Sequence, residues 1–172
     1  LAAELPALLA WLAERGIRVS LDTNWDPAGA WLGLERILPF VSVFMPNREE
    51  ALAIAAVIAG HPVDDLDEAG AVLSLLGCRV VVKSGADGGY AFDAGARSGW
   101  AAGLSVDVTD TTGAGDSFDA GYLAACIRGV EAEDARLRWA AIAGSLSVRG
   151  IGGTGAQATA ADIRSTAWVV GA

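Results

Sequence analysis

The chain has 172 residues, of which 53% are hydrophobic, and its formal net charge is −9. A chain of this length fits one domain and can bury a sizeable core without disulfide or metal crosslinks. The acidic balance provides no basic stripe for a nucleic-acid backbone, and no apolar run reaches the length of a membrane span or resembles a signal segment. We therefore expect a cytoplasmic protein in which Cys78 and Cys126 stay reduced.

Apolar spacing near the start of the chain predicts a helix from Leu5 to Leu12 that ends at Gly16, followed by a strand over Ile17–Leu21. Further strands are expected within 41–47, 79–85 and 106–110, with a hairpin over 88–103. Further helices are expected within 29–40, 47–60, 64–77, 116–129, 132–150 and 159–170, the last with Thr159 as its N-cap. This alternation predicts an α/β fold with a mostly parallel sheet flanked by helices.

Polar residues follow four of the predicted strands at their carboxyl ends, namely Asn24, Asn47, Lys83 and Asp110. In open α/β sheets, ligands bind outside the carboxyl ends of the strands. We therefore expect these four side chains to converge on one edge of the sheet and to mark a ligand site.

The stretch DTTGAGDSFDAGY, from Asp110 to Tyr122, places aspartates among glycines at the start of a predicted helix. Small residues let main-chain N–H groups approach a ligand, and the first amides of a helix lack internal acceptors and lie at the positive end of its dipole. The turn at Gly113–Gly115 therefore predicts an anion site. A carboxylate beside an anion needs another task, and Asp116 suits the acceptance of a proton from an attacking hydroxyl. The alternative is that Asp116 is an N-cap and the glycines form a turn.

The longer motif DTTGAGDSFDAGYLAA resembles the signature of the ribokinase-like (PfkB-type) sugar kinases. The resemblance implies a Rossmann-like three-layer α/β/α core and transfer of the γ-phosphate of ATP to a hydroxyl of a sugar or sugar-like alcohol. It also implies that Gly113, Ala114 and Gly115 cradle the transferring phosphate as an anion hole and that Asp116 is the catalytic base. ATP and Mg²⁺ are the cofactors that it implies.

Asn47 and Glu50, in the segment PNREEA, are similar to the Asn-x-x-Glu motif of the same family. The resemblance places Asn47 near the phosphates and Glu50 in the water network of Mg²⁺. The same two residues also match a helix capping box, in which each side chain accepts a hydrogen bond from the other residue's main-chain N–H group. The two roles are compatible with one another.

Lys83, the only lysine of the chain, lies in VVVKSGADGGY, which resembles the family's strand-then-glycine segment that contacts the nucleotide. Lys83, Gly85 and Gly88 are therefore expected to bind the nucleotide, with Lys83 acting as a compact charge for a phosphate. The alternative for Lys83 is a solvated strand end. Asp110 and Thr112 lie where many relatives bind a monovalent cation such as K⁺.

The resemblance extends over nearly the whole chain, 1–172, but corresponds to the C-terminal portion of the family's kinase domain. It implies that the N-terminal portion, with most of the sugar-binding residues and a small β lid, lies outside the chain. Because that lid often mediates assembly in relatives, a homodimer formed through it is compatible with the resemblance. The chain departs from the family at Trp25 and Asp26, where a basic residue often follows Asp-x-Asn. This departure reflects either a different substrate preference or a helix cap.

The rival hypothesis is a catalytically silent module that binds a nucleotide or serves in regulation. The intact Asp116 favours the enzyme, because a binding module has little need of a base at that position.

Overall fold

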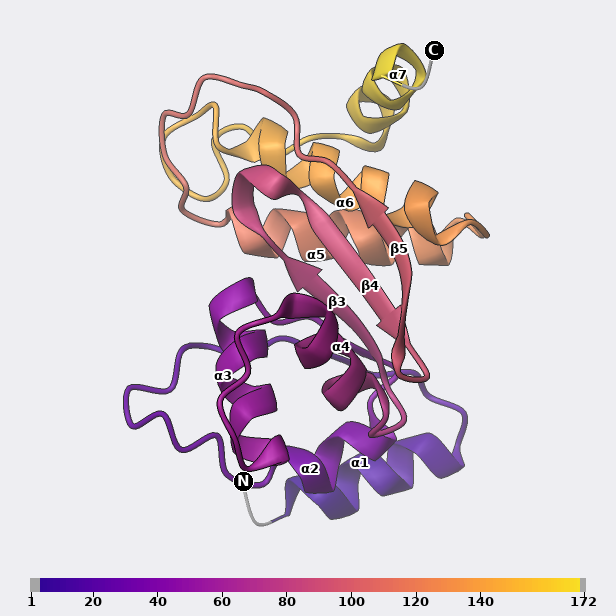
Figure 1. Ribbon diagram of the computed structural model, residues 1–172. Coiled ribbons are helices and arrows are strands. Elements are labelled where there is room, and N and C mark those ends of the chain that lie inside the picture. Colours follow the sequence, from indigo (N-terminus) through magenta and orange to yellow (C-terminus); the bar gives the residue numbers. More distant parts are fainter. Residues whose placement is uncertain (1–3, 171–172) are drawn as a thin grey trace. The chain divides into compact units, whose positions relative to one another are not determined.

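The computed structural model describes residues 4–170, and Figure 1 shows its helices and strands. The chain divides into two compact units, one formed by the residues up to Val82 together with Ala91–Ser98, and the other by Lys83–Tyr90 together with the residues from Gly99 onward. The α-helices are α1 (Leu5–Glu14), α2 (Leu34–Ile37), α3 (Arg48–Ala59), α4 (Leu66–Ser74), α5 (Ala114–Ile127), α6 (Glu133–Ser147) and α7 (Ala160–Val170). Two short 3₁₀ helices are η1 (Leu38–Phe40) and η2 (Gly85–Asp87).

The strands of the sheet follow one another in the order β1-β2-β3-β4-β5. They are β1 (Ser20–Leu21), β2 (Val43–Phe44), β3 (Arg79–Lys83), β4 (Gly89–Asp93) and β5 (Ala96–Ala101). β1 pairs with β2 and β2 pairs with β3, both in parallel, with Ser20 opposite Val43 and Val43 opposite Arg79. The predicted α/β class is thereby confirmed, although β1 is shorter than the strand predicted over Ile17–Leu21.

The first unit has a core formed by side chains from strands and helices. α3 contacts α4, and Ile54 of α3 and Leu73 of α4 are fully buried. Phe44 of β2 and Val80 of β3 are also fully buried. The buried run in β3 matches the expectation for a parallel strand that is covered on both faces.

In the second unit, α5 and α6 run along each other (Figure 1). They approach each other closely at Gly121, where a Cβ atom would lie 2.8 Å from the Cβ of Ala143. The Tyr122 hydroxyl donates to the Glu133 carboxylate, which also accepts a hydrogen bond from Arg136 at 3.0 Å. These contacts join the second half of α5 to the start of α6.

The hairpin predicted over 88–103 is present as β4 and β5. It closes through Ala94 and Gly95, whose φ angles are 49° and 84°. Two successive positive φ angles are the geometry of the two-residue type I′ turn, which matches the twist of antiparallel strands.

The strand predicted over 106–110 is wrong, because this segment has no regular secondary structure. The main-chain N–H groups of Thr109 and Asp110 both donate to the carbonyl oxygen of Val148, at 2.8 and 3.1 Å. Val148 lies at the end of α6, where carbonyl groups lack helical donors. The hydrogen bonds of this segment therefore go to a helix terminus and not to a neighbouring strand.

The last helix begins as predicted. Thr159 Oγ1 accepts a hydrogen bond from the Asp162 N–H at 3.2 Å, and Asp162 Oδ2 accepts one from the Thr159 N–H at 2.9 Å. This reciprocal pair satisfies two donors at the helix start. 

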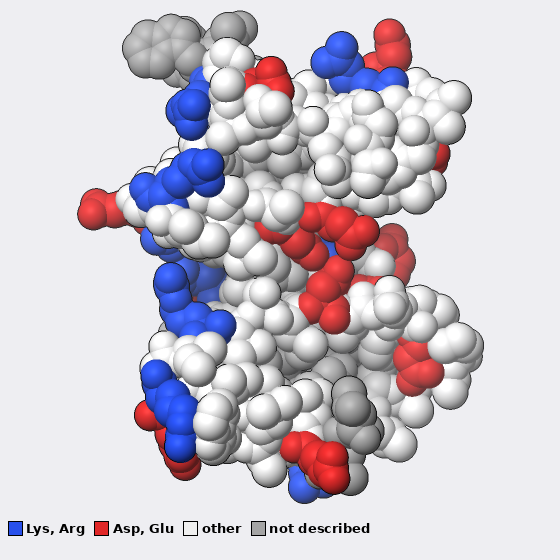
Figure 2. Space-filling model, turned by 180° about the vertical axis from the view of Figure 1, so that it is seen from behind, with Lys and Arg blue, Asp and Glu red and all other residues white. Residues whose placement is uncertain are grey.

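On the face shown in Figure 2, uncharged residues cover most of the surface, and Lys and Arg side chains form small separate groups. Between residues 4 and 170, no helix combines the length and apolar character needed to cross a membrane.

Candidate functional site

A turn of small residues precedes α5. Gly113 is the N-cap of this helix and has a φ of 73°, in the left-handed region that glycine adopts without steric cost. A Cβ atom on Gly113 would lie 2.9 Å from the Cα of Gly153. The turn therefore packs closely against the loop that follows α6, and this contact requires glycine at position 113.

The main-chain amides of this turn are not equivalent. The Ala114 N–H donates to the Thr111 carbonyl oxygen at 3.1 Å. The N–H groups of Gly115 and Asp116 belong to the first turn of α5, where helix geometry provides no acceptor. These two donors lie at the positive end of the helix dipole, so the start of α5 has the features of an anion site.

Asp116 is exposed and occupies the third position of α5. Because Gly113 is the N-cap and no side-chain capping bond is present, the alternative that Asp116 caps the helix is wrong. Among residues 4–170, the Asp116 carboxylate has no hydrogen-bond or ion-pair partner. It is therefore accessible to a ligand at the start of α5.

Lys83 lies at the end of β3 and forms an ion pair with Asp119 of α5. Its Nζ atom is 3.1 Å from Asp119 Oδ2, and the two side chains are 12% and 13% exposed. A Cβ atom on Gly115 would lie 3.6 Å from Lys83 Cδ and 3.9 Å from Lys83 Nζ. Lys83 is therefore not a solvated strand end, and its side chain runs beside the first turn of α5.

The turn after β3 contains Gly85 and Gly88. The Ser84 N–H donates to the Gly88 carbonyl oxygen at 2.8 Å, which closes the turn. Gly88 has a φ of 89° and a ψ of −129°, and a Cβ atom there would lie 2.0 Å from the carbonyl oxygen of Ala101. Only glycine fits this conformation and this close approach.

A cavity of about 410 Å³ brings these features of the second unit together. Five predicted site residues line it: Lys83, Gly85, Gly88, Ala114 and Gly115. The rest of the wall is mostly apolar and consists of Ala86, Leu104, Ser105, Val106, Val108, Thr111, Phe118, Ala141, Gly144, Ser145 and Val148. A cavity of this volume, apolar with a few polar groups, is typical of a small-molecule site.

Asp110 and Thr112 form a compact hydrogen-bonded group near the same turn. Asp110 Oδ1 accepts from the Thr112 N–H at 2.9 Å and from the Thr112 hydroxyl at 2.7 Å, and Oδ2 accepts from the Gly152 N–H at 2.8 Å. The hydrogen bonds from the Thr112 and Gly152 N–H groups, followed by that from the Thr112 hydroxyl, lower the pKa of Asp110. The Asp110 carboxylate therefore stays ionised and joins two loops.

Asn47 and Glu50 belong to the first unit and form the capping box that the sequence allowed. Asn47 Oδ1 accepts from the Glu50 N–H at 2.8 Å, and Glu50 Oε2 accepts from the Asn47 N–H at 3.0 Å. Glu50 Oε2 also accepts from the Thr23 hydroxyl at 3.2 Å, and Glu50 is only 3% exposed. Thr23 thereby connects the end of β1 with the start of α3.

Asp26, which departs from the family pattern, organises the loop after β1 and caps no helix. Its carboxylate accepts hydrogen bonds from the N–H groups of Ala28, Ala30 and Trp31 at 2.9 to 3.0 Å. These bonds, with that from Trp31 the largest contribution, lower the pKa of Asp26. Trp25 is 57% exposed and packs against Trp31 in an edge-on arrangement, with 5.7 Å between ring centroids.

Asn24 and Asn47 belong to the first unit, whereas Lys83 and Asp110 belong to the second. The expectation that all four converge on one edge of the sheet stays a prediction.

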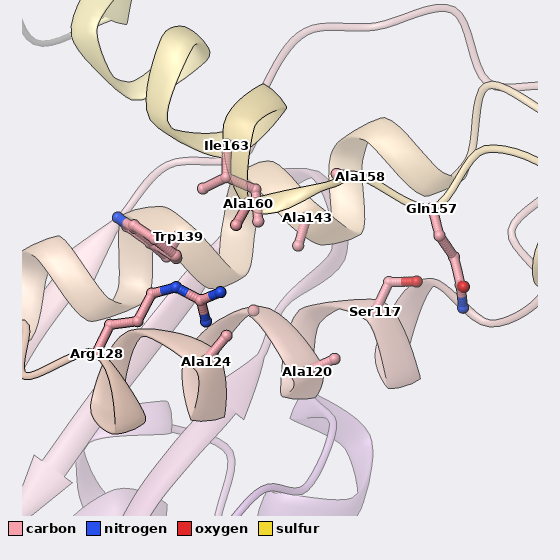
Figure 3. A pocket seen from close by; sticks show the side chains of 11 residues that line it. Ser117, Ala120, Ala124, Arg128, Trp139, Ala143, Gln157, Ala158, Ala160 and Ile163 are labelled. Carbon is pink, nitrogen blue, oxygen red and sulfur yellow. The ribbon is translucent and has the colours of Figure 1, made fainter.

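A further pocket, of about 270 Å³, lies between α5, α6 and the segment that leads into α7 (Figure 3). Arg128 and Trp139 lie at one end, with the guanidinium carbon 5.8 Å from the ring centroid, and Ser117 and Gln157 lie at the other. None of the predicted site residues lines this pocket.

Sequence reasoning missed two parts of the site. It did not single out Asp119 as a site residue, although this residue pairs with Lys83. It also assigned no role to the α6 wall, although Ala141, Gly144 and Ser145 all line the 410 Å³ cavity. Small residues three and four positions apart on one helix face were a signal that could have indicated this wall.

Comparisons with known proteins identify the family of this chain. The profile of the pfkB family carbohydrate kinase matches residues 3–160. The pseudouridine kinase of Escherichia coli (strain K12) is 33% identical over 122 residues, which cover 69% of this chain and 37% of that protein.

Solved structures show the same fold. The ribokinase of Thermotoga maritima matches with a TM-score of 0.74 and 25% identity, over 90% of this chain and 50% of that chain. The ribokinase of Arabidopsis thaliana, complexed with ribose and ATP, matches with a TM-score of 0.77 and 24% identity, over 96% of this chain and 52% of that chain. The ribokinase-like fold is thereby confirmed. The chain spans about half the length of these structures and 37% of the curated relative.

Proposed function

The chain belongs to the pfkB family of carbohydrate kinases, and from this premise we propose that it supplies the nucleotide-binding and catalytic portion of an ATP-dependent phosphotransferase. The enzyme moves the γ-phosphate of ATP to a hydroxyl of a sugar or sugar-like alcohol. One observation carries the proposal: the exposed carboxylate of Asp116 lies in the same helical turn as Gly115, which lines a cavity together with Lys83.

The start of α5 binds the transferring phosphate in this proposal. The N–H groups of Gly115 and Asp116 supply hydrogen-bond donors, and Gly113 and Ala114 shape the turn that presents them. Donors that meet charge developing in the transition state are effective because they are already in place, and the loss of one such donor costs about 3 kcal/mol. Lys83 adds a positive charge beside the same turn.

Asp116 accepts the proton of the acceptor hydroxyl. Phosphoryl transfer passes through a loose transition state, so the attacking oxygen needs little activation and a carboxylate suffices as the base. General-base help of this kind contributes about 10²- to 10⁴-fold to the rate. Asp116 is exposed, so an acceptor hydroxyl can reach its carboxylate.

The nucleotide occupies the 410 Å³ cavity, and Gly85 and Gly88 form the part of its wall that follows β3. The apolar residues of the α6 wall suit a planar base, and the glycine-rich start of α5 suits the phosphates. The T. maritima and A. thaliana structures are both ribokinases, and the latter contains ATP. These names support ATP as the phosphate donor.

Asn47 lies near the phosphates in this proposal, and Glu50 holds Mg²⁺ through water. Residues 4–170 contain no group of three or more His, Cys, Asp or Glu side chains that could hold a metal ion. Mg²⁺ keeps several waters and is held by one or two carboxylates together with substrate phosphates, so a single carboxylate such as that of Glu50 suits this role. When bound, Mg²⁺ neutralises phosphate charge. Glu50 Oε2 accepts hydrogen bonds from the Asn47 N–H and the Thr23 hydroxyl, which hold its carboxylate in place.

Asp110 and Thr112 contribute oxygen ligands to a monovalent cation such as K⁺. An ionised carboxylate has about four acceptor sites, and Asp110 uses three of them. One site remains for a cation, so the residues present fit a site to which Asp110 contributes a single ligand.

The test uses the full-length native protein, a panel of sugars and nucleosides, and the variants Asp116→Asn and Asp107→Asn. Asp116→Asn is expected to lower kcat by at least about 10²-fold while the ATP dissociation constant stays within twofold. Asp107→Asn is the matched control, because Asp107 is exposed and does not line the cavity. Retained activity in Asp116→Asn would remove Asp116 as the base. ATP binding without turnover on any acceptor would favour the silent nucleotide-binding module.

A further inference from the structure

The ion pair between Lys83 and Asp119 is more shielded than a surface pair. Its side chains are 12% and 13% exposed, whereas those of the Arg97–Asp67 pair are 44% and 55% exposed. Solvent and salt screen a shielded pair much less than an exposed one. An ammonium with so little exposure is costly unless a charged partner faces it, and Asp119 is such a partner.

The Lys83 side chain of this ion pair lies beside the start of α5, where the proposed anion site is. The Lys83 side chain passes Gly115 at ordinary van der Waals distance, as measured from a Cβ atom built on that glycine, and both residues line the 410 Å³ cavity. Lys83 therefore reaches the cavity at the place where the first amides of α5 lie. A lysine has a flexible four-carbon stem, so this placement depends on what holds its ammonium group.

α5 carries two aspartates, Asp116 and Asp119, in its first turns. Asp116 and Asp119 are three residues apart on α5, so they lie on the same side of the helix in successive turns. Asp119 is largely buried and pairs with Lys83, while Asp116 is exposed and has no partner among residues 4–170. The Asp119 carboxylate is therefore engaged by Lys83, whereas the Asp116 carboxylate is accessible to a ligand.

We propose that Asp119 is a positioning residue, which holds the Lys83 ammonium beside Gly115 for a nucleotide phosphate and keeps it away from Asp116. The inference rests on the proposed function. An ammonium carries three N–H donors, so one group can bridge a carboxylate and a phosphate oxygen at the same time. Asp119 therefore acts on the nucleotide through Lys83 and touches no substrate itself.

A double-mutant cycle in the full-length native protein tests this role. ATP affinity is measured by calorimetry, and kcat and both KM values are measured by a coupled assay. Asp119→Ala is expected to raise the Kd and KM for ATP about tenfold, a size typical of coupling between contacting residues. The KM for the acceptor is expected to change less than twofold. In a Lys83→Ala background, Asp119→Ala is expected to change ATP affinity no further.

Two variants separate positioning from general stability. Asp119→Glu keeps the charge and is expected to restore ATP affinity to within about threefold of the native value. Glu133→Gln breaks an ion pair of comparable exposure, 20% for Arg136 and 12% for Glu133, away from the cavity. It is expected to lower the Tm and leave the Kd for ATP unchanged.

The positioning role would be overturned if Asp119→Ala raised the Kd for ATP equally in the native protein and in the Lys83→Ala variant. It would also be overturned if Asp119→Ala bound ATP with the native Kd. Either result leaves the proposed kinase function standing. A native protein that binds no ATP would instead remove the proposed function and this inference together.

Discussion

The main-chain N–H of Gly152 donates to Asp110 Oδ2 at 2.8 Å, which ties the loop after α6 to the loop before α5. The same two loops meet again where Gly113 packs against Gly153. The start of α5 is therefore held by a contact between glycines and by one carboxylate. The Asp110 carboxylate therefore helps to hold this turn in place together with the contact between the glycines.

Asp110→Asn is expected to loosen this connection. The native pKa of Asp110 is lowered from 3.8 by hydrogen bonds from the Thr112 and Gly152 N–H groups and then from the Thr112 hydroxyl. A lowered native pKa stabilises the fold above the unfolded value, and this contribution is lost as the pH falls through the native value. The difference in free energy of unfolding between native protein and Asp110→Asn is therefore expected to be present at pH 7 and to shrink below about pH 4.

Urea unfolding at several pH values measures this difference, and amide exchange at Gly152 reports the local effect. Exchange at Gly152 is expected to be faster in Asp110→Asn, because an amide group in place of the carboxylate accepts with one oxygen only. Asp107→Asn serves as the control for a change of charge at an exposed position. A pH-independent difference would contradict the role of the ionised carboxylate.

Gly88→Ala is expected to destabilise the second unit more than Gly85→Ala. Both glycines have positive φ angles, but a Cβ atom on Gly88 would lie 2.0 Å from the Ala101 carbonyl oxygen, whereas one on Gly85 has no atom within 4 Å. Gly85→Ala therefore reports backbone strain alone, about 1 kcal/mol, and Gly88→Ala adds a steric clash and is expected to cost about 3 kcal/mol. Chemical unfolding of both variants measures the difference, and equal losses would show that the turn can move away from β5.

Cys78 is expected to resist alkylation in the folded protein. Burial raises the pKa of its thiol from 9.0 to about 12, and the thiolate is the reactive form. At pH 8, iodoacetamide is expected to modify Cys78 at least about 100-fold more slowly in the native state than in urea. The raised pKa also means that the stability contributed by Cys78 is present below about pH 9 and lost as the pH rises toward 12. Mass spectrometry of the modified peptides provides the measurement, with half-buried Cys126 as internal comparison. Rapid modification of native Cys78 would contradict its burial.

The sequence correctly predicted helices for which the apolar spacing and the N-cap residue indicate the same start. Examples are α3 with its Asn47 cap and α7 with its Thr159 cap. It failed at 106–110, because an alternating pattern describes which side chains are apolar and not where the main-chain donors find acceptors. There the acceptor is Val148, about 40 residues further along the chain.

In the candidate site, too, the sequence predicted the local features and missed the contacts between distant residues. The turn at Gly113–Gly115 is a local feature, and its sequence predicted an anion site at a helix start. Lys83 pairs with Asp119, 36 residues away, and only the folding of the second unit brings these two residues together. Spacing along the chain carries no information about such a pair.

The spacing of Gly115 and Asp119 along α5 has a consequence for insertions and deletions. One added residue between them would turn the rest of the helix by about 100° and shift it by about 1.5 Å. Lys83 would then lose either its carboxylate partner or its place beside the glycine turn. A library of single-codon indels across the gene is therefore expected to yield no active members in this segment, while the loop tip at Ala94 and Gly95 tolerates them more readily.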